Sequence, residues 1–279
     1  RVVQKLHLVP VERRLEAMKE GGFNTFRLGT KDVYLDMLTD SGTNAMSDNQ
    51  VAASMQADDS YAGSETCNRL MNALETVFGT KYFLPAHQGR ACENILAETF
   101  VKQGDVVPMN FHFTTTKAHI TRMGGRVEEL VTKEGLDPHY IHPFKGNFDI
   151  PRLKKLIEEV GADHIPFVRI EAGTNLIGGQ PLSMENMLEV AQICRENGIL
   201  SVLDASLLQD NLYFIKTREE SAKDMTIAEI MRKIADAMDL QRERIAFSVV
   251  SANGNKIVPV KIAPPKKKVV RDGRIVKVI

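Results

Sequence analysis

The chain has 279 residues and a mass of 31.1 kDa, and 43% of its residues are hydrophobic, which suffices for one large domain or two small ones. Lys and Arg together number 36, as do Asp and Glu, so the zero net charge excludes binding through a globally basic or acidic surface. No apolar run approaches the ~20 residues of a membrane span, and Cys67, Cys92 and Cys194 lack zinc-binding spacing, so we expect a cytoplasmic protein with reduced thiols and without a membrane or nucleic-acid partner.

From about residue 80 the sequence alternates short apolar runs with amphipathic ones. Strands are expected at residues 81–86, 105–110, 125–131, 165–172 and 199–205. Helices are expected at residues 89–104, 149–162, 183–198 and 226–238. Ser183 is suited to be the N-cap of the third helix, and Gly198 lies just past its end. This alternation predicts an α/β fold with a mostly parallel sheet sandwiched by helices.

The last stretch of the chain changes character. The turns ANGN and RDGR and short Val/Ile runs predict small hairpins or an extended tail, and from Lys256 onward Asp272 is the single acid among many basic residues. A solvated tail and a local patch for nucleic acid or an acidic partner are both open, but no aromatic residue interleaves the lysines to support base stacking. We therefore divide the chain into an N-terminal segment with a site loop (1–50), a large domain (51–240) and a divergent basic tail (241–279).

The strand expected at residues 199–205 ends on an acid. Residues 199–203 form a nearly apolar run, which is typical of a strand buried on both faces. Asp204 follows at the carboxyl end, where open α/β sheets bind their ligands. This position predicts a functional role for the carboxylate.

A polar turn precedes the helix expected at residues 89–104. The backbone N–H groups of Gln88, Gly89 and Arg90 would lie at the helix N-terminus, where unpaired amides and the helix dipole favour an anion. The side chain of Arg90 would add a positive charge. A capped helix without a ligand explains the same residues equally well.

Two other strand ends carry polar or aromatic side chains. Phe113 is either a core residue or a ring that stacks on a planar ligand, and Asn175 either caps a turn or donates to a ring substituent. With the anion-binding turn and Asp204, they are the four partners that a phosphorylated pyridine ring needs. A carboxylate at the pyridine nitrogen keeps that nitrogen protonated, and the protonated ring is the electron sink of pyridoxal phosphate chemistry.

Three histidines lie in or beside the same loops. Because no acid stands at a readable spacing from His87, His112 or His119, we interpret them as polar loop residues rather than as parts of a catalytic triad. Loops 38–48 and 57–65 are dense in small polar residues and glycine, which indicates turns or site loops.

Six motifs carry a resemblance to a known family. LTDSGTNAMSD, YAGSE, HQGR, FTTT, NLIGGQPLSM and NLYFIK stand in the same order as in the tryptophanase and tyrosine phenol-lyase family, the pyridoxal-phosphate β-eliminating lyases. The chain resembles this family from about Pro10 to about Leu240, which is about the first half of a typical member. The resemblance implies an apparently truncated large domain of the aspartate-aminotransferase-like fold (fold type I). It also implies a homotetramer built as a dimer of dimers, with potassium as a monovalent cation.

The resemblance further implies a reaction and site residues. The family converts tryptophan to indole, or tyrosine to phenol, with release of pyruvate and ammonia. Phe113 matches the ring stacked on the cofactor, Asn175 the residue near its phenolic oxygen, and Asp204 the partner of its pyridine nitrogen. The phosphate-binding turn is matched by Gln88, Gly89 and Arg90.

Other matching residues lie in the two early loops. Thr39 and Ser41 match loop residues near the substrate and cofactor. Tyr61 matches a tyrosine that reaches in from the neighbouring subunit and donates a proton to the leaving aromatic ring. Asp59 lies where the family implies an acidic cation ligand.

The sequence departs from the family in three places. Leu207 replaces an arginine near the phenolic oxygen, and the segment from Leu240 to Lys256 has no lysine where the Schiff-base lysine belongs. The basic tail stands in place of the C-terminal domain, which carries the arginine that binds the substrate carboxylate. Two alternatives therefore stay open. One is a truncated, non-catalytic relative that binds the cofactor or oligomerises; the other is a fragment or a chain joined near Leu240.

Overall fold

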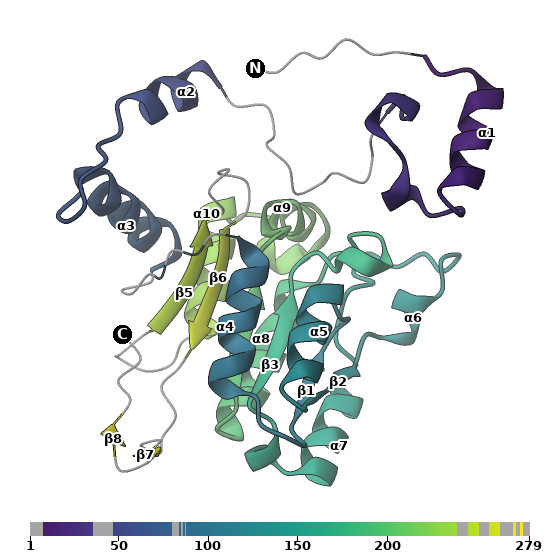
Figure 1. Ribbon diagram of the computed structural model, residues 1–279. Helices are drawn as coiled ribbons and strands as arrows, with labels where there is room; N and C mark the ends of the chain where they lie inside the picture. Colours follow the sequence, from purple (N-terminus) through teal and green to yellow (C-terminus); the bar gives the residue numbers. More distant parts are fainter. Residues whose placement is uncertain are drawn as a thin grey trace. The chain divides into compact units, whose positions relative to one another are not determined.

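The structure is a computed structural model that describes residues 8–35, 47–79, 84, 86 and 88–238, together with the backbone of four short strands after residue 244 (Figure 1). The chain divides into two compact units, Arg1–Asp58 and Asp59–Ile279. None of the helices among the described residues is long and apolar enough to cross a membrane.

The described residues of the first unit form the α-helices α1 (Val11–Glu20) and α2 (Asp48–Met55) and the 3-10 turns η1 (Thr25–Arg27) and η2 (Thr30–Asp32). Arg13 of α1 reaches Asp32 with two parallel hydrogen bonds of 2.9 Å, a fork geometry that favours arginine over lysine. These bonds fasten α1 to the segment that follows it.

The second unit is built on a four-stranded sheet with the order β2-β1-β3-β4, and each neighbouring pair is parallel. The strands are β1 (Val106–Met109), β2 (Arg126–Glu129), β3 (Phe167–Glu171) and β4 (Leu200–Asp204). They confirm four of the five strands expected from the sequence. The fifth, at residues 81–86, lies outside the described residues except for Leu84 and Ala86, which are not in a strand.

Helices of the second unit are α3 (Glu65–Phe78), α4 (Gly89–Phe100), α5 (Thr114–Arg122), α6 (Lys133–Leu136), α7 (Ile150–Val160), α8 (Met184–Glu196), α9 (Leu208–Arg218) and α10 (Ile227–Ala237). The four predicted helices are confirmed as α4, α7, α8 and α10. Ser183 is the N-cap of α8, and its hydroxyl accepts from the Asn186 N–H at 3.2 Å. Helix α4 ends earlier than expected, because Val101 adopts an extended conformation before Gly104 is reached.

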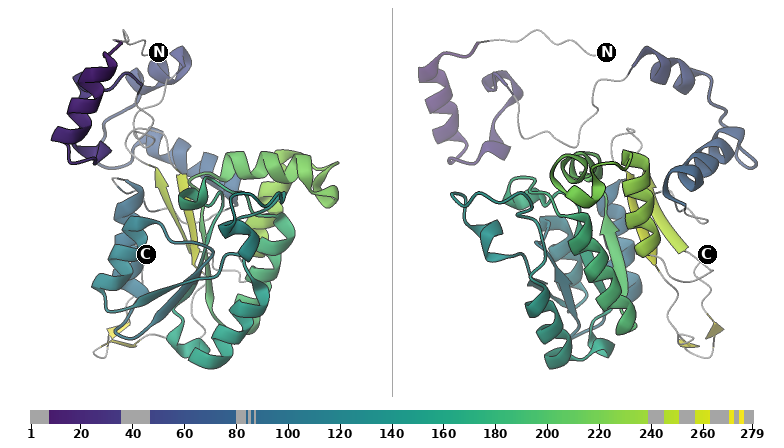
Figure 2. Two further views of the ribbon diagram at one scale, coloured as in Figure 1. Left: turned by 90° about the vertical axis from the view of Figure 1, so that its right-hand side faces the viewer. Right: turned by 180° about the vertical axis from the view of Figure 1, so that it is seen from behind.

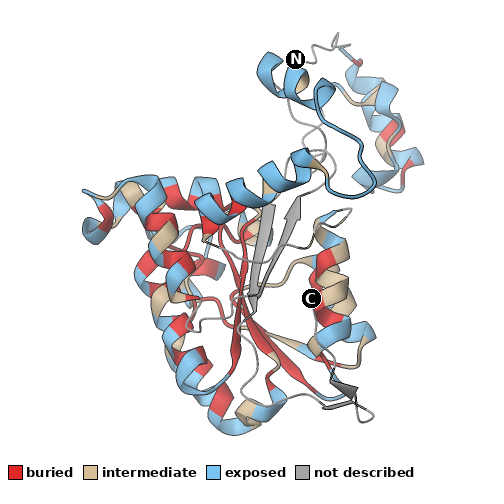
Figure 3. Ribbon diagram, turned by 90° about the vertical axis from the view of Figure 1, so that its left-hand side faces the viewer, coloured by how far each residue is buried: buried red, intermediate tan, exposed pale blue. Residues whose placement is uncertain are grey.

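Helices cover both faces of the sheet, and strands β1, β3 and β4 are buried between two apolar layers (Figures 2 and 3). Side chains alternate along β3: Phe167 packs with α4 and α5, whereas Val168 and Ile170 pack with α7, α8, α9 and α10. This arrangement confirms the predicted α/β sandwich. It also explains why the sequence of β4 is typical of a strand buried on both faces.

After residue 244 the backbone forms two antiparallel hairpins, which is the first of the two alternatives that the turn residues left open. Strand β5 (Ile245–Val250) pairs with β6 (Ile257–Ile262), and β7 (Val270–Arg271) pairs with β8 (Arg274–Ile275). The β5-β6 hairpin lies beside the sheet, with β6 next to β4 (Figure 1).

Candidate active site

Three charged side chains lie on one face of β3 and β4. Glu171 and Asp204 are register partners at the carboxyl ends of the two strands, and Arg169 stands two residues before Glu171. Because side chains alternate along a strand, all three project to the same face, which α4 and α5 cover. They are only 2% (Arg169), 4% (Glu171) and 7% (Asp204) exposed, so water does not screen their charges effectively.

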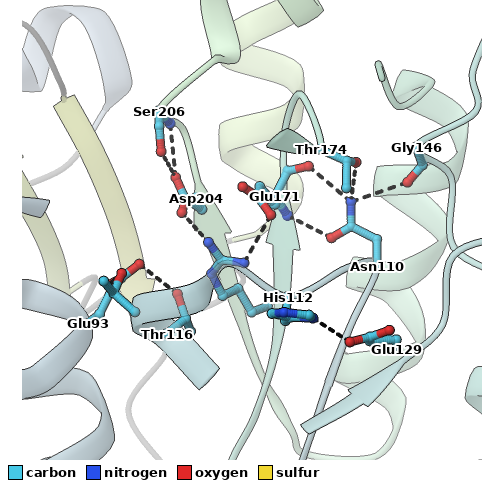
Figure 4. A network of polar contacts seen from close by, with 12 residues as sticks. Glu93, Asn110, His112, Thr116, Glu129, Gly146, Glu171, Thr174, Asp204 and Ser206 are labelled. Carbon is cyan, nitrogen blue, oxygen red and sulfur yellow. Dashed lines mark hydrogen bonds and ion pairs between the residues drawn. The ribbon is translucent and has the colours of Figure 1, made fainter. Parts of the chain in front are cut away.

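The Arg169 guanidinium bridges the two carboxylates. Its Nη1 donates to Glu171 Oε2 at 3.3 Å, and its Nη2 donates to Asp204 Oδ2. The other oxygen of Asp204 accepts from the backbone N–H of Ser206 at 3.0 Å and from the Ser206 hydroxyl (Figure 4). A carboxylate offers about four lone-pair positions, so Asp204 keeps an acceptor position that these three bonds do not use.

Burial and mutual charge set the protonation of the two acids. Burial raises the pKa of Glu171 to about 7; the Arg169 guanidinium opposes this rise, and the negative charge of Asp204 adds to it. Burial alone would raise the pKa of Asp204 as well, but Arg169 and the hydrogen bonds from Ser206 outweigh it and hold that pKa below its ordinary value. At neutral pH Asp204 is therefore an anion, and Glu171 is divided between its two forms.

Helices α4 and α5 are joined beside this cluster. The hydroxyl of Thr116 donates to the carboxylate of Glu93 in α4 at 2.6 Å (Figure 4). The hydroxyl of Thr115 donates to the same carboxylate. The charge of Glu93 also acts on Arg169. The early turns of α4, the start of α5 and the ends of β3 and β4 thus converge on one region.

Asn110, the residue that follows the neighbouring strand β1, anchors the end of β3. This fully buried side chain accepts from the N–H of Glu171 at 3.0 Å and donates to its carbonyl at 3.0 Å (Figure 4). Its amide also donates to Thr174 Oγ1 at 2.9 Å and to the carbonyl of Gly146 at 3.2 Å. The backbone that leads from Glu171 toward Asn175 is therefore fixed by hydrogen bonds.

The structure places several predicted site residues around the same sheet edge. Gln88 is the N-cap of α4 and provides no side-chain cap, so the helix begins at Gly89 without one. Arg90 is exposed. Half-buried Phe113 is the N-cap of α5, and half-buried Asn175 opens the 3-10 turn η4 (Asn175–Ile177). Their roles toward a ligand stay predictions.

Two of the remaining predicted residues are exposed in one loop, and the other two lie outside the described part of the chain. Asp59 is exposed, and Tyr61 is fully exposed at 105%, both in the loop between α2 and α3. Thr39 and Ser41 lie outside the described residues. No group of three His, Cys, Asp or Glu that could hold a metal ion occurs in the described part of the chain.

The interpretation of the histidines needs a correction. His112 does have a supporting acid, because its Nδ1 contacts the Glu129 carboxylate at the end of β2, and its ring stacks on Phe111 at a centroid distance of 5.1 Å. The partner is 17 residues away in sequence and becomes adjacent only through the β1-β2 pairing. The loop interpretation is wrong for His119, which lies in the last turn of α5, and His87 lies outside the described residues.

Leu207, which departs from the family pattern, packs against the loop that carries Asn175. Gly173 has φ of +80°, and a Cβ atom there would lie 2.6 Å from the Cβ of Leu207. Glycine at position 173 allows both the positive φ and the close approach of Leu207. Asn211 holds the same loop, because its Oδ1 accepts from the N–H of Gly173 at 3.0 Å and of Leu182 at 2.8 Å.

Arg169 and Glu171 are absent from the residues that the motifs predict. A usable signal exists: they stand two residues apart in an otherwise apolar strand, so they share a face, and a buried charge needs a partner. The identity of that partner, Asp204, depends on the β3-β4 register. Asn110 and Glu93 leave no comparable pattern in the sequence.

Comparisons with known proteins agree with the fold and the motifs. The family model described as "Beta-eliminating lyase" matches residues 36–242. The chain is 43% identical over 239 residues to a Tyrosine phenol-lyase of Symbiobacterium thermophilum, and 44% identical over 239 residues to a Tyrosine phenol-lyase of Pasteurella multocida. Each match covers 86% of this chain and 52% of the relative, so the chain spans about half the length of these curated relatives.

One solved structure confirms the predicted fold class. An aminotransferase from Anaerococcus prevotii aligns with 91% of this chain and 63% of its own chain, with a TM-score of 0.54 and 17% sequence identity. At that identity the likeness concerns the fold alone. The family, in contrast, follows from the sequence match over most of the chain: this protein belongs to the β-eliminating lyase family.

Proposed function

We propose that the chain forms the cofactor-binding part of a pyridoxal-phosphate-dependent lyase that removes the aromatic side group of an amino acid. Tyrosine is the first candidate substrate and tryptophan the second, because the relatives from Symbiobacterium and Pasteurella are named tyrosine phenol-lyases. Family membership is the observation that carries the proposal.

The chain's own residues fit a phosphorylated pyridine ring. Asp204 is a buried anion at the carboxyl end of a parallel strand, with an acceptor position that the Arg169 and Ser206 bonds leave free. The N-terminus of α4 has no side-chain cap, which suits a phosphate group. A pyridine ring with a phosphate arm requires an acid for its ring nitrogen and an anion site for its phosphate, and these two groups provide them.

Each of these groups would have a defined task. Asp204, kept ionised by Arg169, would hold a proton on the ring nitrogen. Pyridoxal phosphate, when bound, supplies an electron sink for the negative charge that develops at the substrate α-carbon. Phe113 would cover the ring and Asn175 would donate to its phenolic oxygen. The phosphate would be bound by Gln88, Gly89 and Arg90.

Further parts of the proposal concern the assembled enzyme. Tyr61, which is fully exposed in this chain, would donate a proton to the leaving ring of a neighbouring subunit. Thr39 and Ser41 would lie near the substrate, and Asp59 would contribute to a potassium site. The assembled enzyme would be a dimer of dimers in the cytoplasm.

A non-catalytic relative is the second candidate, and one observation favours it. From Leu240 to Lys256 the sequence contains no lysine at the family's position. A lysine there would act as the general base, a contribution of roughly 10² to 10⁴ in rate. A chain without that base would still bind the cofactor through Asp204 and the α4 N-terminus.

Borohydride reduction with peptide mass mapping separates the two candidates. The purified chain is incubated with pyridoxal phosphate, reduced and digested, and pyruvate release from L-tyrosine and L-tryptophan is measured in parallel. A pyridoxyl group on one defined lysine together with pyruvate release supports the lyase. Saturable cofactor binding without an adduct or pyruvate supports the non-catalytic relative, and absence of binding contradicts both.

A further inference from the structure

Glu171 has no task in the proposed function, although its carboxylate faces the ring-binding acid. It is the register partner of Asp204, and both side chains lie on the face covered by α4 and α5. Two carboxylates held side by side in a buried site repel each other. The fold retains both because Arg169 lies between them.

Arg169 divides its positive charge between the two acids. It donates to Asp204 through one terminal nitrogen and to Glu171 through the other. The pull of the guanidinium on Asp204 therefore depends on whether Glu171 is charged. When Glu171 is neutral, Arg169 and Asp204 form a balanced pair; when Glu171 is ionised, the cluster has a net charge of −1.

We propose that Glu171 is a positioning residue that, through Arg169, controls how strongly Asp204 binds a protonated pyridine ring. This inference rests on the proposed function and deepens it. An ionised Glu171 draws Arg169 toward itself and leaves more negative charge on Asp204 for the ring N–H. Loss of the proton from Glu171 thus increases the affinity of the cluster for a protonated pyridine ring.

The groups around Glu171 support tighter binding of the ring when Glu171 is ionised. Arg169 lies on its own strand, Asp204 faces it from β4, and the backbone of Asn175 hydrogen-bonds its carboxylate. Glu93 of α4 adds a negative charge that acts on Arg169. Asn110, the residue after β1, is neutral, and it contacts Glu171 through the Glu171 backbone rather than its carboxylate.

The size of the effect follows from the titration of Glu171. With a pKa of about 7, its ionised fraction rises from about one tenth at pH 6 to about nine tenths at pH 8. If the ionised cluster is the binding-competent form, the apparent Kd falls by about tenfold over this range. The E171Q variant, which mimics the neutral acid, lacks this part of the pH dependence.

Calorimetric titration with pyridoxamine 5′-phosphate tests the inference. This ligand carries an amine and cannot form an imine with a lysine, so its binding does not depend on where the family lysine stands. The wild type and E171Q are compared at pH 6 and pH 8, and circular dichroism verifies that both are folded. The titrations of the ligand itself are the same for both proteins and cancel in the comparison.

The E129Q variant is the matched control, because Glu129 is also a carboxylate at a strand end of the same sheet and contacts a histidine. For each protein we compare the Kd at pH 6 with the Kd at pH 8. We expect this ratio to be about tenfold larger in the wild type and in E129Q than in E171Q. Equal pH dependence in the wild type and E171Q overturns the inference alone. So does loss of the dependence in E129Q rather than in E171Q. Absence of binding to all three proteins overturns the proposed function, and the inference with it.

Discussion

Removing Arg169 is the most informative perturbation of the buried cluster. In R169M a neutral side chain of similar length replaces the guanidinium, and Glu171 and Asp204 are left facing each other without a cation. Loss of one partner from a buried ion pair typically costs about 3–5 kcal/mol. We expect a loss of this size in the free energy of unfolding at pH 8.

The loss in the free energy of unfolding caused by R169M should grow as the pH rises. Arg169 holds down the pKa of Glu171, so the variant keeps a proton on Glu171 at pH values where the wild type releases it. A folded state that retains more protons loses stability as the pH rises. The destabilisation by R169M is therefore expected to be smaller at pH 5.5 than at pH 8.

Urea unfolding followed by far-UV circular dichroism measures this cost, which suits a chain without tryptophan. R126M is the control: Arg126 lies 2.7 Å from Glu128 in a half-exposed pair at the sheet edge. Such surface pairs contribute at most about 1 kcal/mol. If R169M costs no more than R126M at both pH values, Arg169 does not balance the charges of the two buried carboxylates.

Three further predictions concern Glu171, Asn110 and the cysteine thiols. The pKa of Glu171 is raised from 4.5 to about 7, so its contribution to the free energy of unfolding is complete below pH 4.5 and is lost by about pH 7. Between these pH values the free energy of unfolding of E171Q should therefore rise by up to about 3 kcal/mol relative to that of the wild type, as read from urea midpoints. N110A leaves the buried N–H of Glu171 without its acceptor and should lower the free energy of unfolding by about 1–3 kcal/mol in the same assay; a loss below that of a surface substitution contradicts the anchoring role. Burial raises the pKa of the Cys92 thiol to about 11 and of the Cys194 thiol to about 12, so Ellman's reagent should titrate one thiol, that of exposed Cys67, in the folded chain at pH 8 and three after unfolding.

The layered fold could be predicted because its pattern is local. Strands β3 and β4 lie in short, mostly apolar segments of the length expected for strands, and α7, α8 and α10 show helical spacing with Pro, Ser or Thr at their starts. Helix α9 carries the same kind of signal, with Leu208, Leu212 and Ile215 buried at helical spacing, yet it is not among the predicted elements. Helix α5 offers less, because three β-branched threonines open it and favour an extended or loop conformation.

The polar contacts could not be predicted in the same way, because they depend on register between distant strands. Asp204 stands out in the sequence as a lone acid after an apolar strand. Its bond to Arg169 spans 35 residues and requires the β3-β4 alignment. The contact of His112 with Glu129 likewise requires β1 to lie beside β2. Sequence patterns identify which strand ends carry polar groups, and only the fold pairs them.

A crystal structure of the chain with pyridoxamine 5′-phosphate tests the proposed site most directly. We expect the ring nitrogen within hydrogen-bonding distance of Asp204, at about 2.8 Å, and the phosphate at the N-terminus of α4. A ligand bound elsewhere, or a ring that reaches this edge with its nitrogen away from Asp204, would contradict the assignment of the cofactor site.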